Sequence, residues 1–105
     1  MAYKLVQVLF SYAAAGSPAA SQAATERAHR IAAEVSGLIW KIWTYDATTA
    51  EAGGVYLFTD EASAQAYLAG PIFASLKALP EVENMQVRLL DVDSDRSQIT
   101  RAPLG

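Results

Sequence analysis

GLIWKIWTYDATTAEAGGVYLFTD, residues 37–60, contains two apolar segments joined by a short polar connection. Leu38–Tyr45 and Val55–Thr59 are rich in aromatic and aliphatic side chains, a composition typical of β-strands. Asp46–Ala52 is small and polar, and the Gly53-Gly54 pair is expected to ease a tight loop before the second strand. The stretch therefore predicts an antiparallel β-hairpin in the middle of the chain.

A strand and a helix are predicted before this hairpin. Tyr3–Phe10 has the aliphatic and β-branched composition of a strand. Ser17 suits a helix N-cap, and Pro18 suits the first helical position because its missing N–H would have no partner there. From there alanines and Ile31 recur on one helical face, and Gly37 supplies the stop. The pattern predicts one long amphipathic helix.

A second helical region and a last strand are predicted after the hairpin. Asp60 can cap a helix that Gly70-Pro71 interrupts and Pro80 ends. Glu83–Val92 predicts a fourth strand, and residues 93–105 are expected to form a polar, solvated tail. The order β-α-β-β-α-β is that of a ferredoxin-like α+β fold, in which two helices cover one face of a four-stranded antiparallel sheet. Residues 1–105 are thus expected to form a single domain.

Alternation along the strands divides their side chains between the two faces of the sheet. The set expected beneath the helices is almost wholly apolar: Val6, Val8, Phe10, Leu38, Trp40, Ile42, Val55, Leu57, Met85, Val87 and Leu89. The opposite face is expected to mix polar and apolar side chains: Tyr3, Leu5, Gln7, Leu9, Ile39, Lys41, Trp43, Tyr45, Tyr56, Phe58, Gln86, Arg88 and Leu90. A sheet face in water is normally mostly polar, so this second face predicts a homodimer in which another subunit covers it.

The composition excludes several classes of function. The 105 residues are 52% hydrophobic and 18% charged, as expected of a folded globular domain. A net charge of −3 with scattered basic residues argues against a nucleic-acid partner. There is no cysteine, and a single histidine cannot build a histidine-rich metal site. Neither a signal-peptide pattern nor an apolar run of about 20 residues is present, so we expect a cytoplasmic protein without a membrane partner.

Two motifs of the hairpin resemble a known family. WKIW at residues 40–43 and EAGGVYLFTD at residues 51–60 are similar to the YdhR-like monooxygenase family, and roughly residues 37–101 share the resemblance. It also covers Ala66-Tyr67-Leu68, Asp91-Val92 and Ser97-Gln98-Ile99. The resemblance implies a dimeric α+β barrel, in which two sheets face each other and each subunit holds a cavity between sheet and helices. It further implies an oxidoreductase that oxidises a small aromatic or polyphenolic compound without a cofactor.

The sequence contains no signature of a flavin, nicotinamide or metal site. Gly53-Gly54 lacks the G-x-G-x-x-G spacing and precedes a strand rather than a helix. Metal-dependent oxygen chemistry typically needs two histidines and a carboxylate, which one histidine cannot supply. An oxygenase built on this chain would therefore rely on a substrate that reduces O2 directly after deprotonation. Such a site needs an aromatic cavity, a base and a group that stabilises the substrate anion.

One face of the predicted sheet offers residues for such a site. The expected aromatic wall is Trp43, Tyr56 and Phe58, and the expected polar groups are Gln7, Lys41 and Arg88. Alternation places all six on the same face. A second interpretation remains open, in which the aromatics pack a dimer interface and the lysine and arginine reach its rim.

A histidine, an arginine and three aspartates are the remaining candidates for a functional role. His29 is a base by residue type, but helical phasing places it opposite the alanine stripe, which favours a solvated surface histidine. Arg27 lies near the edge of that stripe, where it can pair with a carboxylate or lie over the rim of the core. Asp91, Asp93 and Asp95 are spaced like the start of a calcium loop, but the glycine and glutamate of such a loop are missing, so we assign them to the solvated tail.

Three functions are compatible with these residues. The first is a cofactor-independent monooxygenase with Lys41, Arg88 or His29 as the catalytic candidate. The second is a non-catalytic dimer that binds a small molecule in the same cavity. The third is haem degradation, which requires an axial histidine aimed into the cavity, and the phasing of His29 argues against it.

Overall fold

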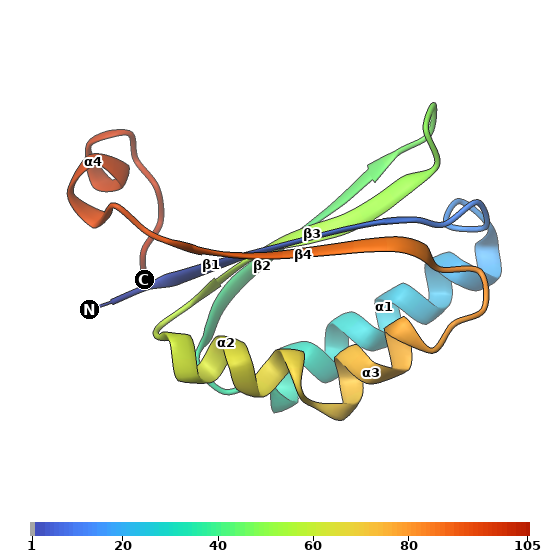
Figure 1. Ribbon diagram of the computed structural model, residues 1–105, viewed down its shortest axis with the longest axis horizontal. Coiled ribbons are helices and arrows are strands. Elements are labelled where there is room, and N and C mark those ends of the chain that lie inside the picture. The colour runs from blue at the N-terminus through green and yellow to red at the C-terminus, as the bar shows by residue number, and fades with distance from the viewer. Residues whose placement is uncertain (1) are drawn as a thin grey trace.

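A four-stranded antiparallel sheet organises the chain in the computed structural model, which describes residues 2–105. The strands are β1 (Lys4–Ser11), β2 (Leu38–Asp46), β3 (Glu51–Phe58) and β4 (Glu83–Asp91), in the spatial order β2-β3-β1-β4. The helices are α1 (Pro18–Glu34), α2 (Glu61–Leu68), α3 (Pro71–Lys77) and α4 (Ser94–Ile99). Figure 1 shows α1, α2 and α3 on one side of the sheet and α4 on the other. The ferredoxin-like α+β fold predicted from the sequence is confirmed.

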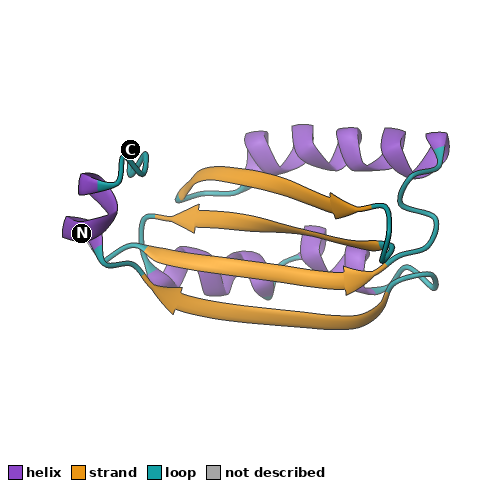
Figure 2. Ribbon diagram, turned by 90° about the horizontal axis from the view of Figure 1, so that it is seen from above, coloured by secondary structure: helices purple, strands orange, loops and turns teal. Residues whose placement is uncertain are grey.

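The helices α1 and α2 begin where the sequence predicts. The Ser17 hydroxyl accepts a hydrogen bond from the Ala20 N–H at 3.2 Å, and the Asp60 carboxylate accepts one from the Ser63 N–H at 2.8 Å. Each cap satisfies an N–H group that has no partner within its own helix. Figure 2 shows the long helix α1 along the β2 edge of the sheet, whereas the shorter helices α2 and α3 lie behind the middle of the sheet.

The main core lies between the sheet and the first three helices. Its buried members come from β1, β3 and all three helices: Val6, Val8, Phe10, Ile31, Tyr56, Phe58, Ala64, Tyr67, Ile72, Phe73 and Leu76. Five of these are aromatic, and the four rings from β3, α2 and α3 contact one another. The α1 helix contributes Ile31 as its one buried residue, so the core depends mainly on α2 and α3.

The assignment of β3 to the two faces was wrong. We call the side of the sheet opposite α1–α3 the open face. Val6 pairs with Tyr56 across β1 and β3, so Tyr56 lies beneath the helices, whereas Val55 and Leu57 lie on the open face. Both alternating halves of the segment VYLF are apolar, so alternation alone carries no signal about which half faces the helices.

A β-bulge reverses the faces of β2 as well. Leu38 pairs with Phe58, but Trp40 pairs with Leu57, so one extra residue is inserted between them. Lys41 then lies opposite Tyr56 on the helix side of the sheet. Trp40 and Ile42, which we predicted beneath the helices, lie on the open face instead. The predictions for β1 and β4 are confirmed, because Val6 pairs with Leu89 and Val8 with Val87.

The two glycines before Val55 lie inside β3 and not in a loop, contrary to the sequence-based expectation. The strand begins at Glu51, and both glycines are buried. A Cβ atom at Gly53 would lie 1.9 Å from the carbonyl oxygen of Val8 on β1. The glycine thus permits a close approach of two strands that any side chain would prevent.

The C-terminal tail is folded, which corrects the prediction of a solvated extension. The Asp93 carboxylate caps α4 by accepting a hydrogen bond from the Arg96 N–H at 3.1 Å. The indole N–H of Trp40 donates to the carbonyl oxygen of Pro103 at 2.7 Å, and Leu104 is only 8% exposed. The tail therefore returns to the open face and covers part of it, including the Trp40 side chain. Leu57 on that face is 1% exposed.

We expect Leu104→Ala to lower the free energy of unfolding by roughly 2 kcal/mol, because it removes buried methyl groups from the tail's contact with the sheet. Urea unfolding followed by circular dichroism measures this difference. Ile99→Ala in α4 is the matched control, since Ile99 is 80% exposed and should change the free energy by less than about 0.5 kcal/mol. Equal effects of the two substitutions would show that the tail is not packed in solution.

Candidate functional site

A cavity of about 210 Å³ lies between α1 and the sheet. Four alanines from α1 and the segment before it line the side opposite the sheet, and they leave space above β2 and β3 where larger side chains would fill the core. These small lining residues are Ala15, Ala20, Ala23 and Ala24. The alanine enrichment of the first helix thus creates a cavity rather than a tightly packed layer.

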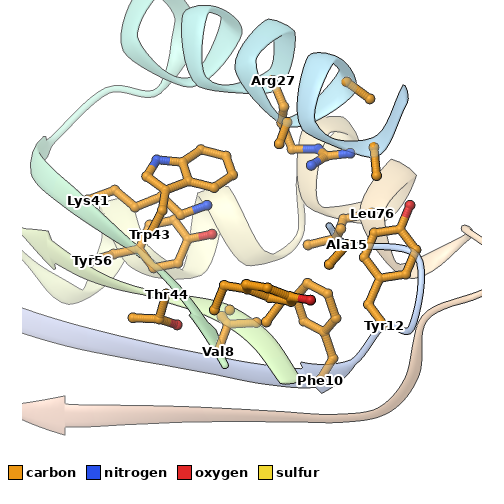
Figure 3. Close-up of a pocket in the computed structure, with 16 residues that line it drawn as sticks. Val8, Phe10, Tyr12, Ala15, Arg27, Lys41, Trp43, Thr44, Tyr56 and Leu76 are labelled. Carbon is orange, nitrogen blue, oxygen red and sulfur yellow. The ribbon is translucent and has the colours of Figure 1, made fainter. Parts of the chain in front are cut away.

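Aromatic side chains form most of the remaining wall. Figure 3 shows several of them around the cavity, together with Arg27 from α1. They come from β1, the segment after it, β2 and β3: Phe10, Tyr12, Trp43, Tyr45 and Tyr56. Trp43 is 41% exposed, whereas Tyr56 is buried. The cavity is therefore apolar and suited to a flat ring.

The side chain of Lys41 extends from β2 over the neighbouring strand β3, and its amine lies among the aromatic rings of the cavity. Its Nζ atom is 3.3 Å from the ring centroid of Trp43 and 4.6 Å from that of Tyr56. Gly54 makes this position available, because a Cβ atom there would lie 2.6 Å from Cε of Lys41. The second glycine of the EAGGVYLF segment therefore positions a functional side chain in the neighbouring strand.

The electrostatic environment of Lys41 is unusual. Burial and the positive charge of Arg27 lower the pKa of the Lys41 amine from 10.5 to about 7. The faces of Trp43 and Tyr56 act in the opposite direction, because they stabilise the cation. Within residues 2–105 the ion pairs involve Lys4, Arg30 and Arg96, so no carboxylate neutralises either cation of the cavity. Lys41 can therefore exchange a proton near neutral pH.

A pair of buried tyrosines lies beneath Lys41. The hydroxyl groups of Tyr56 and Tyr67 are 2.9 Å apart, and either can donate to the other. Burial raises the pKa of both hydroxyls, and the hydrogen bond to Tyr67 raises that of Tyr56 further. Both hydroxyls therefore stay protonated at neutral pH.

The structure brings three of the six predicted site residues together. Lys41, Trp43 and Tyr56 line the cavity, and Phe58 stacks behind Tyr56 at a centroid distance of 6.1 Å. They lie beneath the helices and not on the open face, so the aromatic wall faces α1 instead of a second subunit.

Gln7 and Arg88 do not belong to this group. They pair with each other across β1 and β4, and Gln7 pairs with Val55 on its other side. Both side chains therefore lie on the open face, away from Tyr56. The reversed faces of β2 and β3 explain why the sequence grouped them with the cavity residues.

His29 and Arg27 are the two candidate residues that lie on α1. His29 is exposed and does not line the cavity, in agreement with its helical phasing. Arg27 lines the cavity, and we did not include it among the site residues. Its position at the edge of an alanine-rich inward face was the available signal, since a charged side chain there has space to reach inward.

Asp91 at the end of β4 and Asp93 just after it have structural partners. Asp91 pairs with Lys4, and Asp93 caps α4.

Across residues 2–105 the structure contains no group of three or more His, Cys, Asp or Glu side chains arranged to hold a metal ion. In the same part of the chain, none of the helices combines the length and apolar character needed to cross a bilayer.

The family profile described as "Putative mono-oxygenase ydhR" matches residues 5–103, nearly the whole chain and all of the cavity residues. The chain belongs to this family. None of the curated proteins matches it. The resemblance of the hairpin motifs to the ydhR family is thus confirmed over a longer stretch than residues 37–101.

Solved structures of distant relatives share the ydhR-family fold. A "putative antibiotic biosynthesis monooxygenase" from Caulobacter crescentus is 14% identical with a TM-score of 0.71, over 87% of this chain and 90% of that one. SnoaB, a cofactor-independent oxygenase from Streptomyces nogalater, is 16% identical with a TM-score of 0.64, over 87% and 93%. A dimeric ferredoxin-like protein of unknown function from Jannaschia is 17% identical with a TM-score of 0.60, over 87% and 98%. At these identities the likeness shows the fold alone.

The low pKa of Lys41 gives this ydhR-family protein a measurable pH dependence of stability. Between pH 7 and 10.5 the unfolded chain binds a proton that folded Lys41 has released, so stability rises with pH in that window. We expect the free energy of unfolding of the natural protein, relative to Lys41→Met, to rise by about 1 to 3 kcal/mol from pH 7 to pH 9.5. Denaturant unfolding across this range measures it.

Lys77→Met provides the matched control, because Lys77 is exposed at the end of α3 and does not line the cavity. Its substitution should leave the pH dependence of the natural protein intact. A Lys41→Met variant whose stability follows the same pH curve as the natural protein would show that Lys41 has an ordinary pKa.

Proposed function

We propose that the cavity is the active site of a cofactor-independent monooxygenase that oxidises a small aromatic or polyphenolic compound. The observation that carries this proposal is the position of Lys41, an amine with a pKa of about 7 inside an aromatic cavity and beside Arg27. A general base is most effective when its pKa lies near the working pH. Membership of the ydhR family and the fold shared with SnoaB support the same reaction class.

The proposed reaction starts with proton transfer. The neutral Lys41 amine accepts the proton of a phenolic hydroxyl, and the new ammonium group and Arg27 stabilise the phenolate. The electron-rich ring carbon para to the oxygen reduces O2 and forms a C–O bond, and the resulting peroxide takes the proton back. Loss of the ring C–H proton and cleavage of the O–O bond then release water. One phenol and one O2 thus give one quinone and one water.

Oxygen consumption with a panel of phenols whose para carbon bears a hydrogen tests this function. We expect kcat/KM to rise as pH increases through about 7, because protonated Lys41 cannot accept the substrate's proton. Lys41→Met should lower kcat/KM by about 100-fold or more, in the range that general bases contribute. Lys77→Met is the control for loss of a lysine outside the cavity and should retain full activity.

Gly54→Ala separates the placement of Lys41 from its presence. The added methyl group would lie 2.6 Å from Cε of Lys41 and must displace the flexible end of that side chain. We expect lower activity with Lys41 still in the chain. Saturable binding of aromatic compounds without oxygen consumption by the natural protein would reject the monooxygenase and favour the non-catalytic binding protein.

We also propose that the open face pairs with the open face of a second copy of the chain. Leu9 and Ile42 are exposed there, Ile42 by 56% of its surface, next to the partly buried Val55. Apolar residues gathered on one sheet face are costly in water unless another surface covers them. The dimeric ferredoxin-like protein from Jannaschia shares this fold. The cytoplasmic location and the absence of a cofactor remain predictions from the sequence.

Sedimentation equilibrium at micromolar concentration tests the homodimer. We expect a dimer for the natural protein and a monomer for Ile42→Glu, because a buried unpaired carboxylate opposes association. Ala33→Glu on the exposed side of α1 adds the same charge away from the sheet and should stay dimeric. A monomeric natural protein would remove this proposal and leave the cavity chemistry unaffected.

A further inference from the structure

The cavity contains two basic side chains and no acidic one. Arg27 enters it from α1 and Lys41 from β2, as Figure 3 shows. Neither aspartate nor glutamate occurs among its lining residues. Within residues 2–105, the hydrogen bonds of arginine side chains involve Arg30 and Arg96, so the guanidinium donors of Arg27 are not used by the protein. Arg27 is half-buried, so its donors are left to water, and an anion in the cavity can take the place of that water.

The size of the cavity limits what this anion can be. Its volume is about 210 Å³, whereas an apolar cavity of about 150 Å³ holds one benzene molecule. One ring with a few additional heavy atoms therefore fits, and a set of three fused rings does not. Trp43 and Tyr56 provide faces against which a single ring can pack.

We propose that the ligand is a single-ring aromatic carboxylate that also carries a hydroxyl group, with its carboxylate bound by Arg27. A guanidinium matches the planar carboxylate through two parallel hydrogen bonds, which gives both affinity and orientation. The hydroxyl group is then available to Lys41, in the role assigned above. This inference rests on the proposed function, because it uses the same cavity, but it specifies a charge and a size that the proposed function leaves open.

A bound carboxylate also changes the protonation of Lys41. In the free protein the positive charge of Arg27 is one of the causes that hold the pKa of Lys41 low. An anion at Arg27 offsets that charge, so the amine binds a proton more readily and ligand binding takes up protons near pH 8. The titratable groups that line the cavity are Tyr12, Arg27, Lys41, Tyr45 and Tyr56. Of these, Lys41 is the group that titrates near neutral pH.

Isothermal titration calorimetry with matched compounds tests the proposal. The pair 3-hydroxybenzoate and 3-hydroxybenzyl alcohol shares the ring, the phenol and a hydrogen on the carbon para to the hydroxyl group, but differs in charge. We expect the carboxylate to bind about tenfold more tightly or better, as a charge-assisted hydrogen-bonded pair should. Titrations at pH 8 in buffers with different ionisation enthalpies should show proton uptake that disappears in Lys41→Met. An anthracene carboxylate should not bind.

Arg27→Met should abolish the preference for the carboxylate. Arg30→Met is the matched control on the same helix, because Arg30 is exposed and pairs with Glu34 at 3.2 Å. Circular dichroism confirms that both variants fold. Equal affinity for the alcohol and the carboxylate, or an unchanged preference in Arg27→Met, would overturn the proposal.

The two proposals fail in different ways. Tight, Arg27-dependent binding of 3-hydroxybenzoate without oxygen consumption would reject the monooxygenase but keep the assignment of the ligand. Oxygen consumption with neutral polyphenols, and no preference for the carboxylate, would reject the assignment of the ligand but keep the monooxygenase.

Discussion

Lys41 lies opposite Tyr56, and Trp43 opposite Gly54, because β2 contains one extra residue between Leu38 and Trp40. This register turns the amine and the indole toward α1, and it turns Trp40 and Ile42 toward the open face. Without the bulge the lysine would leave the cavity, because shifting a strand by one residue exchanges its two faces. The place of Trp43 in the aromatic wall, the low pKa of Lys41 and the position of Ile42 on the open face all depend on this one irregularity in strand pairing.

The site is obtained at the expense of packing. Alanines on the inward face of α1 leave space that larger side chains would fill, and an amine with no carboxylate partner occupies the edge of that space. Both features oppose folding, since voids forfeit dispersion contacts and buried charges lose hydration. The aromatic contacts from Tyr56 through Tyr67 to Phe73 stabilise the opposite half of the core, where α2 and α3 pack closely. The protein thus divides its interior into a packed half and a hollow half.

The sequence predicted the order of elements because each local signal was strong: Ser17-Pro18 begins α1, Asp60 begins α2, and the hairpin motifs are strand-like. It also placed Lys41, Trp43 and Tyr56 on one face of the hairpin correctly. It failed to assign that face to the helix side, since VYLF is apolar in both alternating positions and a bulge leaves no mark in composition. Arg27 was missed as a site residue for a related reason. Where a long side chain points depends on the space that its neighbours leave, and this space is a property of the packed structure.

The docked tail bears on how the protein can be handled in the laboratory. The hydrogen bond from Trp40 to the Pro103 carbonyl holds the last residues on the open face, and Figure 1 shows both ends of the chain at the same end of the sheet. An affinity tag or reporter protein fused directly after Gly105 would add its bulk beside Trp40 and Ile39. A fusion partner therefore needs a long flexible linker, or a position in the exposed connection between β2 and β3.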